Sequence, residues 1–491
     1  MAHQNLRNAR NYRDDGKAGA LPPGPAGSWP GPHLTREGRR RRGTAPLPRT
    51  AVRPVRRPPG RWTPSPGAAV YRVNASWRWR AWRAADGGGG GAGYRRNMAQ
   101  PTEIWDVAVI GAGPAGAMAA LAAASLGKRV VILERFGIPR YKTCAGGLIG
   151  ASMNALPAGF SPPVRAVAKS FTFSVRGWPE RTRVSGTPLV NLVRRDEFDA
   201  SLVAEAVAAG ATVYGNTAVT RLTPEADVMR VTTRNRGEVT ARIVVGADGS
   251  AGRSAAYVGV VLDQVDLGLE VELVPPGDQS AAWADRILID WGTIPGAYAW
   301  VFPKGDTVSV GVIAERGDPD LTRSYLRDFL ARLGLDQQET VVSSGHLTRC
   351  RTPDSPLYRD RVLVAGDAAG LLEPWTREGI SFALRSGTIA GRAAAQAAAA
   401  ASTAEATAAM AAYAAEVSAA LAPEMIAGRM LQRAFTRHPR LFYMAIALLP
   451  KAWDFVVRAI SGETNFADVA KSPLVRKLLL ALGSGPRRAR R

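Results

Sequence analysis

The sequence predicts an α/β protein that combines a Rossmann-type parallel sheet, an antiparallel sheet and a C-terminal helical segment. Near residue 104 an apolar strand, a helix and a second strand follow one another, which is typical of a βαβ unit and a parallel sheet. Between about residues 261 and 312, short segments alternate apolar and polar residues. Such alternation favours an antiparallel sheet with one face over a cavity.

The parallel part begins with an apolar strand over Ile104–Ile110, which a Gly-rich turn follows. An alanine-rich helix is expected to run to about Leu126, and the second strand covers Lys128–Glu134. A further helix is predicted at about Glu197–Ala209. More strands are predicted at about residues 211–213, 242–245 and 361–365.

The antiparallel part comprises four predicted strands, at residues 267–274, 285–291, 297–303 and 307–312. An alanine-rich stretch from about Ile380 to Ala422 is then expected to be broken at Pro423, because proline lacks a backbone N–H. The last segment, about Glu424–Leu482, is predicted to be helical and amphipathic. Charged residues interrupt its best apolar run, so no membrane span is predicted.

The net charge of +23 is concentrated at the ends of the chain. Residues 1–97 contain 20 Lys and Arg against 4 Asp and Glu, and residues 485–491 add four Arg. The 387 residues between carry 40 basic and 37 acidic side chains, a net of +3. A nucleic-acid-binding protein that uses the basic extension is therefore a weak alternative, although Trp77, Trp79 and Trp82 lie among its arginines.

Residues 1–97 are rich in Gly and Pro and lack helical or strand periodicity. We expect a disordered basic extension, or an upstream region that is not translated, because Met98 lies six residues before the first strand. Two cysteines exclude a disulfide scaffold and suit a cytoplasmic protein. His346, Cys350 and His438 show no metal-ligand spacing, so they are interpreted as structural and no metal site is predicted.

The turn after the first strand, Gly111-Ala-Gly-Pro-Ala-Gly116, predicts a dinucleotide site. Gly111 permits the tight turn, Gly113 lets the backbone approach a pyrophosphate, and Gly116 allows close helix–strand packing. Glu134 ends the second strand 23 residues after Gly111, where an acid can bind a ribose hydroxyl. An acid there favours FAD or NAD over NADP.

Two later motifs resemble the aromatic-hydroxylase-like superfamily of FAD-dependent reductases and monooxygenases. They are Val245-Gly-Ala-Asp-Gly-Ser250 and Val364-Ala-Gly-Asp-Ala-Ala-Gly370, each at the end of a predicted strand. The resemblance implies FAD as cofactor. It also implies FAD-binding roles for these residues: Arg135, Arg195, Asp248, Gly366, Asp367, Gly379 and Ile380.

Two further segments resemble the geranylgeranyl reductase family. Arg140-Tyr-Lys-Thr-Cys-Ala-Gly-Gly147 is similar to its Lys-x-Cys-Gly-Gly-Gly loop, and Tyr298-Ala-Trp-Val-Phe-Pro303 to its Tyr-x-Trp-x-Phe-Pro signature. In that family the signature lines an apolar prenyl tunnel. The resemblance thus implies that Tyr298, Trp300 and Phe302, which have period 2 and share one strand face, bind the substrate.

The sequence departs from the family pattern at two positions. Ala145 replaces a glycine after the cysteine, and Arg377 stands where the family usually has glycine. An arginine near the flavin either stabilises the anionic form of the reduced flavin or narrows the path by which the substrate reaches the flavin. Cys144 has two interpretations: a small buried apolar residue, or a thiol that donates or orients the proton completing alkene reduction.

The resemblance implies a discontinuous FAD-binding domain at residues 98–170, 190–260 and 345–400. A substrate domain is expected at 171–189 and 261–344, a helical segment at 401–484 and a basic tail at 485–491. The implied activity is the reduction of C=C bonds in a polyprenyl lipid of the geranylgeranyl type, with hydride from N5 of the reduced flavin. The alternative enzyme is an FAD-dependent monooxygenase.

The expected partners are a prenyl lipid, an electron donor and an anionic membrane surface, with no specific nucleic acid. No second GxGxxG motif follows a predicted strand and opens a helix, so NAD(P)H is expected to bind transiently, or a ferredoxin-like protein to serve as donor. The amphipathic C-terminal segment carries arginines beside aromatic residues. We therefore expect a cytoplasmic protein that can bind peripherally to the inner face of the membrane.

Overall fold

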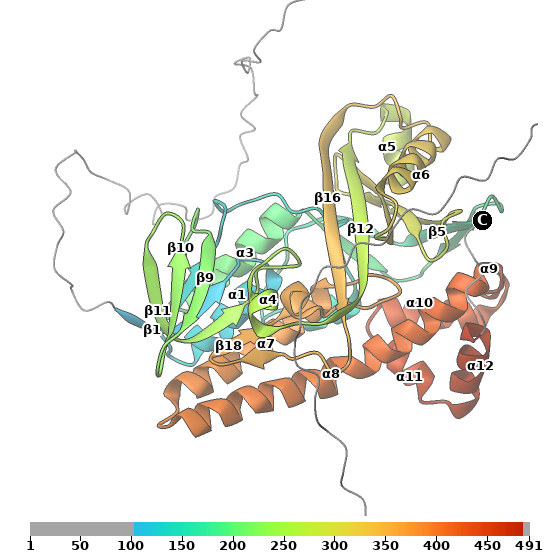
Figure 1. Cartoon of the computed structure of the whole chain (residues 1–491). Coiled ribbons are helices and arrows are strands. Elements are labelled where there is room, and N and C mark those ends of the chain that lie inside the picture. The colour runs from blue at the N-terminus through green and yellow to red at the C-terminus, as the bar shows by residue number, and fades with distance from the viewer. Residues whose placement is uncertain (1–102, 485–491) are drawn as a thin grey trace, which may run out of the picture. The chain divides into compact units, whose positions relative to one another are not determined.

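The structure, a computed structural model, describes residues 103–484 (Figure 1). The extension at residues 1–97 and the tail at 485–491 lie outside the described residues. Within the described part, two large sheets and one small sheet are joined to a set of helices. The predicted α/β class is therefore confirmed, including the C-terminal helices.

The first large sheet has eight strands and a parallel centre, ordered β17-β18-β11-β1-β2-β8. Each of the central pairs β18–β11, β11–β1, β1–β2 and β2–β8 is parallel. Strands β9 and β10 extend from β11 as an antiparallel meander. The strands are β1 (Ile104–Ile110), β2 (Val130–Leu133), β8 (Thr212–Tyr214), β9 (Val219–Pro224), β10 (Met229–Thr233), β11 (Glu238–Gly246), β17 (Tyr358–Arg359) and β18 (Val362–Val364).

Helices α1 (Pro114–Ser125) and α7 (Ile380–Ala399) pack on this sheet, and α3 (Arg195–Ala208) packs against α1. Small residues let α1 and α7 approach each other closely. A Cβ on Gly387 of α7 would lie 2.3 Å from the carbonyl oxygen of Ala115, and one on Gly391 would lie 2.2 Å from that of Ala119. The alanine-rich composition of both helices thus reflects their packing distance.

The second large sheet has seven strands in the order β16-β12-β15-β14-β13-β5-β6. Its neighbours are antiparallel except β13 and β5, which are parallel. The long strands β12 and β16 lie side by side, and α5 and α6 lie toward one end of them (Figure 1). The strands are β5 (Ser170–Val175), β6 (Arg181–Val184), β12 (Leu262–Leu273), β13 (Arg286–Trp291), β14 (Tyr298–Pro303), β15 (Val308–Glu315) and β16 (Thr340–Arg351).

A small sheet, ordered β3-β7-β4, joins the two large ones in sequence. It consists of β3 (Gly147–Leu148), β7 (Val190–Val193) and β4 (Val164–Ala168). Short helices accompany the sheets: α2 (Gly150–Asn154), α4 (Ser254–Val258), α5 (Gly277–Trp283), α6 (Pro319–Arg332) and the 3-10 helix η2 (Gly366–Ala369).

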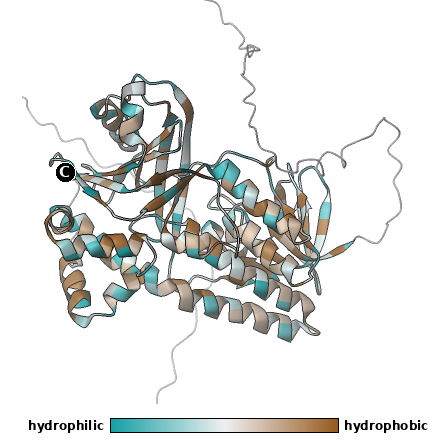
Figure 2. Ribbon diagram, turned by 180° about the vertical axis from the view of Figure 1, so that it is seen from behind, coloured by the Kyte–Doolittle hydropathy of each residue, from teal (hydrophilic) through white to brown (hydrophobic). Residues whose placement is uncertain are grey.

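The C-terminal part consists of α8 (Thr403–Arg437), α9 (Pro439–Leu448), α10 (Pro450–Ile460), α11 (Phe466–Ala470) and α12 (Pro473–Gly483). Figure 2 shows apolar and polar residues interspersed along these helices. In the described part of the chain, no helix is both long and apolar enough to span a membrane.

The expected break at Pro423 is wrong, because α8 continues through this residue and the chain turns at residues 400–402 instead. Pro423 lies on the exposed side of the helix, while Leu421 and Met425 are buried on the other. Arg385 donates a hydrogen bond at 2.9 Å to the carbonyl oxygen of Ala420 in the adjoining turn. Packing of the buried side and solvation of the exposed side therefore outweigh the intrinsic cost of proline.

The domain limits proposed from the sequence stay a prediction, but the sheets refine them. Strand β16 runs to Arg351 and pairs with β12 along its length. The expected boundary between residues 344 and 345 therefore falls inside a strand of the seven-stranded sheet.

Candidate active site

The predicted dinucleotide loop joins β1 to α1 and is held by close backbone contacts. Gly111 has φ of +100°, and a Cβ there would lie 2.4 Å from the carbonyl oxygen of Ala247. A Cβ on Gly116 would lie 1.9 Å from the carbonyl oxygen of Gly111. At Gly113 the nearest atom to a Cβ is Arg140 Nη2, at 3.6 Å, so this side of the loop is open. Bare backbone at a helix N-terminus is suited to a phosphate group.

Glu134 follows β2 and closes the other side of the loop. Its Oε2 accepts a hydrogen bond from the backbone N–H of Ala112 at 2.8 Å, and its Oε1 accepts one from Phe136 at 3.1 Å. Arg140 Nε lies 3.3 Å from Glu134 Oε2. The structure thus places Glu134 against the Gly-rich loop, whereas Arg135 is exposed and lies 4.9 Å over the ring of Phe136.

The Asp248 loop, at the end of β11, contacts the same turn through Ala247. Asp248 Oδ2 accepts backbone hydrogen bonds from Arg253 at 2.7 Å and Ser254 at 3.1 Å. Burial raises the pKa of this carboxyl group, against the effect of these hydrogen bonds. Its Oδ1 is buried with no hydrogen-bond partner among the described residues. This oxygen is therefore free to accept a hydrogen bond from a ligand.

Asp367 follows β18 and lies next to His346 of β16. His346 Nε2 is 3.5 Å from Asp367 Oδ2 and 3.3 Å from Ser250 Oγ, so the imidazole bridges the two aspartate motifs. Burial alone would raise the pKa of Asp367. The His346 hydrogen bond and the charges of Lys142 and Arg195 more than offset it, so the net pKa falls. Asp367 is consequently held as an anion.

The start of α7 lies directly beside Asp367. A Cβ on Gly379, which precedes the helix, would lie 3.5 Å from Asp367 Oδ1. Ile380 is the first helical residue and is buried. Gly366 donates its N–H to Ser386 Oγ of α7 at 3.0 Å, which ties the Asp367 loop to this helix. The positive end of α7 therefore points at the region where these motifs meet.

Arg195, the first residue of α3, is buried and pairs with Asp199 through Nε at 2.8 Å and Nη2 at 3.0 Å. Arg140 donates to the same carboxylate at 3.1 Å, so two arginines share Asp199. Burial lowers the pKa of Arg195, but Asp199 and the adjacent Cys144 side chain raise it by more. Arg195 thus remains a cation, and it lies next to the Cys144 sulfur.

The Cys144 loop has a fixed backbone. Gly146, with φ of +78°, donates its N–H to Cys144 Sγ at 3.4 Å, and a Cβ on Gly146 would lie 2.1 Å from the carbonyl oxygen of Val193. Lys304, just after β14, donates from Nζ to the carbonyl oxygen of Cys144 at 2.9 Å. The seven-stranded sheet therefore holds the loop that carries the thiol.

Lys304 is buried between two carboxylates of β12. Its Nζ lies 2.6 Å from Glu272 Oε1 and 3.6 Å from Glu270 Oε1. Burial and the charge of Glu272 raise the pKa of Glu270, while Lys304 lowers it; the net direction is upward. Tyr141 donates to Glu270 at 3.2 Å. Because the two carboxylates share one ammonium group, Glu270 is favoured in its protonated, neutral form. The net negative charge buried behind the Cys144 loop is smaller as a result.

The three predicted aromatic residues share one face of β14, as their spacing implies. Trp300 is buried, donates from Nε1 to Ser309 Oγ at 3.0 Å and covers Gly311, where a Cβ would lie 2.1 Å from its ring. The rings of Tyr298 and Trp300 are 6.2 Å apart. Phe302 reaches the Cys144 loop, since a Cβ on its Gly147 would lie 3.2 Å from the Phe302 ring.

The face of the seven-stranded sheet that carries Trp300 is divided into a polar half and an aromatic half. On β12 the even-numbered residues Asp266, Glu270 and Glu272 are buried on the polar half. The aromatic half is covered by the C-terminal helices, with Phe435 5.0 Å from Trp291 and Trp453 6.3 Å from Phe171 between ring centres. The apolar region is thus bounded by the sheet, the Cys144 loop and helices α8 to α10.

Arg377 adopts a backbone conformation that favours glycine, with φ of +58°. Its buried guanidinium pairs with Asp266 through Nε at 3.2 Å and Nη2 at 3.4 Å, and donates to the carbonyl oxygen of Trp375 at 2.8 Å. It also lies 5.6 Å over the ring of Tyr298. Asp266 thus neutralises the cation that replaces the family's glycine, and Arg377 packs against the aromatic strand.

The structure brings most of the predicted residues to one region, and it adds four that sequence reasoning did not assign. His346, first interpreted as structural, contacts Asp367, and Arg140, Asp266 and Lys304 hold the other groups in place. The alternating acids of β12 and the lysine after Pro303 were visible signals in the sequence. Arg135, by contrast, is exposed and contacts the ring of Phe136.

The described groups fit FAD. The open side of the loop at Gly113 suits a pyrophosphate, and the unpartnered Asp248 Oδ1 accepts hydrogen bonds from hydroxyl groups. Arg195 and the N-terminus of α7 supply positive charge near Cys144 and Asp367. Over residues 103–484, no cluster of three or more His, Cys, Asp or Glu residues has the arrangement of a metal site.

The Arg377–Asp266 pair yields a stability prediction. Arg377→Gly would relieve the positive φ but leave Asp266 buried without its cation. We expect the free energy of unfolding to fall by about 3–5 kcal/mol, the usual cost of breaking a buried ion pair from one side. Urea denaturation of the purified protein measures this change.

The double variant Arg377→Gly, Asp266→Asn is the matched control. It removes both charges, and the amide can still accept a hydrogen bond from Gln264, which now donates to Asp266 at 2.7 Å. Most of the lost stability should therefore return. Equal instability of the single and double variants would contradict an ion-pair origin.

Comparison with known proteins supports the FAD assignment. Residues 105–272 match the family model of an FAD binding domain. Digeranylgeranylglycerophospholipid reductase 1 of Methanopyrus kandleri is 35% identical over 311 residues, which is 60% of this chain and 81% of that protein. Digeranylgeranylglycerophospholipid reductase 3 of Methanosphaera stadtmanae is 32% identical over 317 residues, 60% of this chain and 77% of that protein.

Two solved structures share the fold. A geranylgeranyl bacteriochlorophyll reductase-like protein from Thermoplasma acidophilum has a TM-score of 0.60 at 22% identity, over 77% of this chain and 99% of that one. A flavin-dependent brominase has a TM-score of 0.58 at 20% identity with the same coverage. At these identities the structures show a common fold, whereas the sequence relatives show the family. The chain belongs to the geranylgeranyl reductase family of FAD-dependent oxidoreductases.

Proposed function

We propose that the protein reduces C=C bonds in the polyprenyl chain of a lipid of the geranylgeranyl type. The observation that supports this most directly is the meeting of the Cys144 loop with the aromatic strand β14. Phe302 contacts the loop at Gly147, and Lys304 binds the carbonyl oxygen of Cys144. A thiol, an apolar aromatic surface and the FAD-binding loops thus face one region. The names of the sequence relatives are consistent with this substrate class.

The chain's own residues would bind and orient the cofactor. Gly111, Gly113 and Gly116 would admit the pyrophosphate at the start of α1, and Asp248 and Asp367 would bind hydroxyl groups of FAD. When bound in its reduced form, FAD supplies a hydride from N5. The N-terminus of α7 would favour the negative charge of the reduced cofactor.

Cys144 would donate the proton that completes the reduction. Its sulfur lies beside Arg195, so the thiolate left after proton transfer would face this cation. Lys142 is close in the same loop, where burial lowers the pKa of its ammonium group. One proton from Sγ and one hydride then saturate one double bond. Water would return the proton to Cys144.

Tyr298, Trp300 and Phe302 would hold the alkene flat against the cofactor. An isolated alkene is a poor hydride acceptor, so its reduction depends on near-attack geometry and the exclusion of water. The rigid environment of Trp300, fixed by Ser309 and Gly311, suits that role. NAD(P)H or a ferredoxin-like protein would supply the electrons.

Mass spectrometry of lipid extracts tests the reaction. Incubation of the purified protein with a reductant and a geranylgeranyl lipid should raise the lipid mass by two hydrogens for each bond reduced. Heat-denatured protein is the control. A gain of one oxygen atom instead would indicate a monooxygenase and contradict the proposal.

The cofactor site gives a second prediction. Asp367→Ala removes a carboxylate that contacts His346 beside the start of α7, and Gly113→Val fills the open side of the loop. Both variants should lose FAD on purification, measured by flavin absorbance per protein. Asp336→Ala, at an exposed loop, is the control and should retain the cofactor. A full complement of FAD in both site variants would refute this placement.

The proton-donor role of Cys144 can be separated from reduction of the cofactor. In Cys144→Ser, single-turnover oxidation of the pre-reduced protein by lipid should slow by roughly 10²-fold or more, the scale for loss of a general acid. Reduction by the external donor should be nearly unchanged. Stopped-flow absorbance follows both half-reactions.

Cys350→Ser is the matched control, because this buried thiol donates to the carbonyl oxygen of Leu372 and does not face Arg195. The pre-reduced Cys350→Ser variant should be oxidised by lipid at the rate of the unaltered protein. An unaltered oxidation rate in Cys144→Ser would leave Cys144 a structural residue and make water the proton source.

We further propose that helices α9 and α12 bind the surface of an anionic membrane. Leu441, Met444 and Leu448 form an exposed stripe on α9, and Leu474 and Leu478, 77% and 56% exposed, form one on α12. Residues 439–483 also contain six Lys and Arg against three Asp and Glu. Exposed apolar stripes with basic neighbours are typical of interfacial helices.

Vesicle sedimentation tests this surface. The protein should sediment with vesicles that contain phosphatidylglycerol and be released by high salt. Replacement of Leu474 and Leu478 by serine should reduce binding without loss of FAD. Leu126→Ser, at an exposed residue of the parallel-sheet region, is the control. Binding that these changes leave intact would contradict the assignment.

A further inference from the structure

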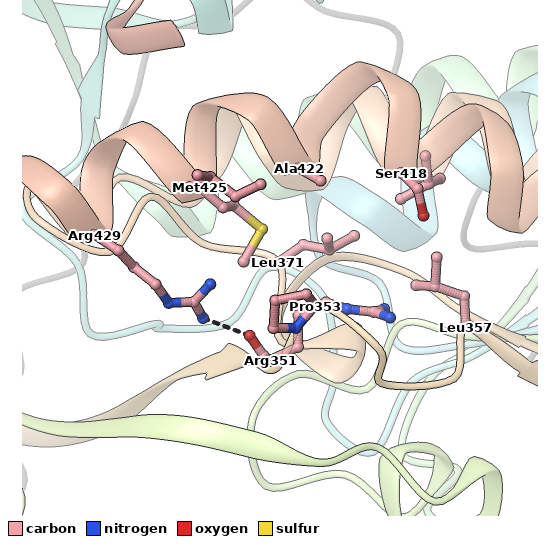
Figure 3. A pocket seen from close by; sticks show the side chains of 10 residues that line it. Arg351, Pro353, Leu357, Leu371, Ser418, Ala422, Met425 and Arg429 are labelled. Carbon is pink, nitrogen blue, oxygen red and sulfur yellow. Dashed lines mark hydrogen bonds between the residues drawn. The ribbon is translucent and has the colours of Figure 1, made fainter. Parts of the chain in front are cut away.

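A cavity separate from the candidate active site lies between α8 and the segment after β16. Pro353 and Leu357 of that segment and Leu371, just after η2, form one side. Residues of α8, including Ser418, Ala422 and Met425, form the other side (Figure 3). None of the residues proposed to bind FAD or the prenyl chain lines this cavity. Its wall is apolar except for Ser418 and two arginines, Arg351 and Arg429.

Arg351 is a buried cation whose side chain has no partner in the described part of the chain. It is 6% exposed, and within residues 103–484 its guanidinium makes no hydrogen bond or ion pair. Its Nη1 is fully buried and has no acceptor among the described residues. Only its backbone is engaged: the N–H donates to the carbonyl oxygen of Gly370 at 2.9 Å, and the carbonyl oxygen accepts from Arg429.

The other buried arginines show how unusual this is. Arg195 and Arg377 are similarly buried, and each has a carboxylate within hydrogen-bond distance, Asp199 and Asp266 respectively. Arg429, at the same cavity, pairs with Asp263. Burial without such an anion lowers the pKa of Arg351 to about 10. An unpaired guanidinium in an apolar wall is costly unless an anion binds it.

We propose that this cavity binds an amphiphilic anion, with its carboxylate or phosphate head on Arg351 and its apolar tail against Leu357, Leu371 and Met425. The guanidinium fork matches the geometry of either head group. Such a ligand would also contact the loop that carries Asp367, because Arg351 binds Gly370 at the end of that loop and Leu371 lines the cavity. The proposal does not depend on the identity of the prenyl substrate.

Calorimetric titration of the FAD-loaded protein tests the ligand class. Octanoate and octyl phosphate supply the two head groups on the same tail. Acetate and inorganic phosphate supply the heads alone, and 1-octanol supplies the tail alone. At least one of the two amphiphiles should bind, and the tighter of them identifies the head group. The proposal would be overturned if 1-octanol bound as tightly as both amphiphiles. It would also be overturned if neither amphiphile bound.

Arg351→Met tests the role of the positive charge, because methionine removes the guanidinium but keeps an unbranched apolar side chain in the cavity wall. Affinity for the preferred amphiphile should fall roughly tenfold or more, the scale of a charge-assisted hydrogen bond. Without ligand, the thermal unfolding midpoint of this variant should rise, because a buried unpaired charge is removed. At the same ligand concentration, the midpoint of the unaltered protein should rise by more than that of the variant.

Arg392→Met is the matched control, since Arg392 is exposed and pairs with Glu416 on the surface. It should change neither the affinity nor the response to ligand. Suppose that Arg351→Met lowers the thermal unfolding midpoint and leaves the affinity for ligand intact. Ordered water then hydrogen-bonds the guanidinium, and the cavity binds water rather than an anion. That result would also overturn the proposal.

Discussion

A row of backbone hydrogen bonds at the carboxyl edge of the parallel sheet sets the positions of the loops that carry Gly111, Asp248 and Asp367. Gly111 donates to Leu133 at the end of β2, at 2.9 Å, and Ala247 donates to Ile110 at the end of β1, at 2.9 Å. Ala365 continues the row at the end of β18. The Gly111 and Asp248 loops approach each other so closely that a Cβ on Gly111 would lie 2.4 Å from the carbonyl oxygen of Ala247. The acidic and glycine residues that follow each strand consequently face a common region.

The second sheet supplies chemistry that the parallel sheet lacks, and it does so by dividing one face into two halves. Buried acids on β12 form the polar half, where Lys304 compensates Glu272 and anchors the Cys144 loop. Aromatic residues on β14, β13 and β5 form the other half, which the C-terminal helices cover. The loop that bears the thiol thus lies at the boundary between charged and apolar surfaces. Such a boundary is suited to transferring a proton to an apolar substrate.

The replacement of a family glycine by Arg377 illustrates how a fold accommodates a large change. The positive φ of Arg377 is an unfavourable backbone conformation for a residue with a side chain. The side chain, however, pairs with the carboxylate of Asp266 and contacts the ring of Tyr298. The new cation therefore adds no net charge to this region. It contacts the apolar surface through the ring of Tyr298.

Local patterns determined much of this protein, because spacing fixes which residues share a turn or a strand face. The strand–turn–helix motif at Gly111, the order of the two aspartate motifs and the period-2 aromatics of β14 were all predictable from the sequence. Tertiary structure alone decided the contact of His346 with Asp367 and the pairing of Arg377 with Asp266, 111 residues away. It also decided that α8 continues through Pro423. These features depend on which strands become neighbours and which helix face is solvated, and no local pattern contains that information.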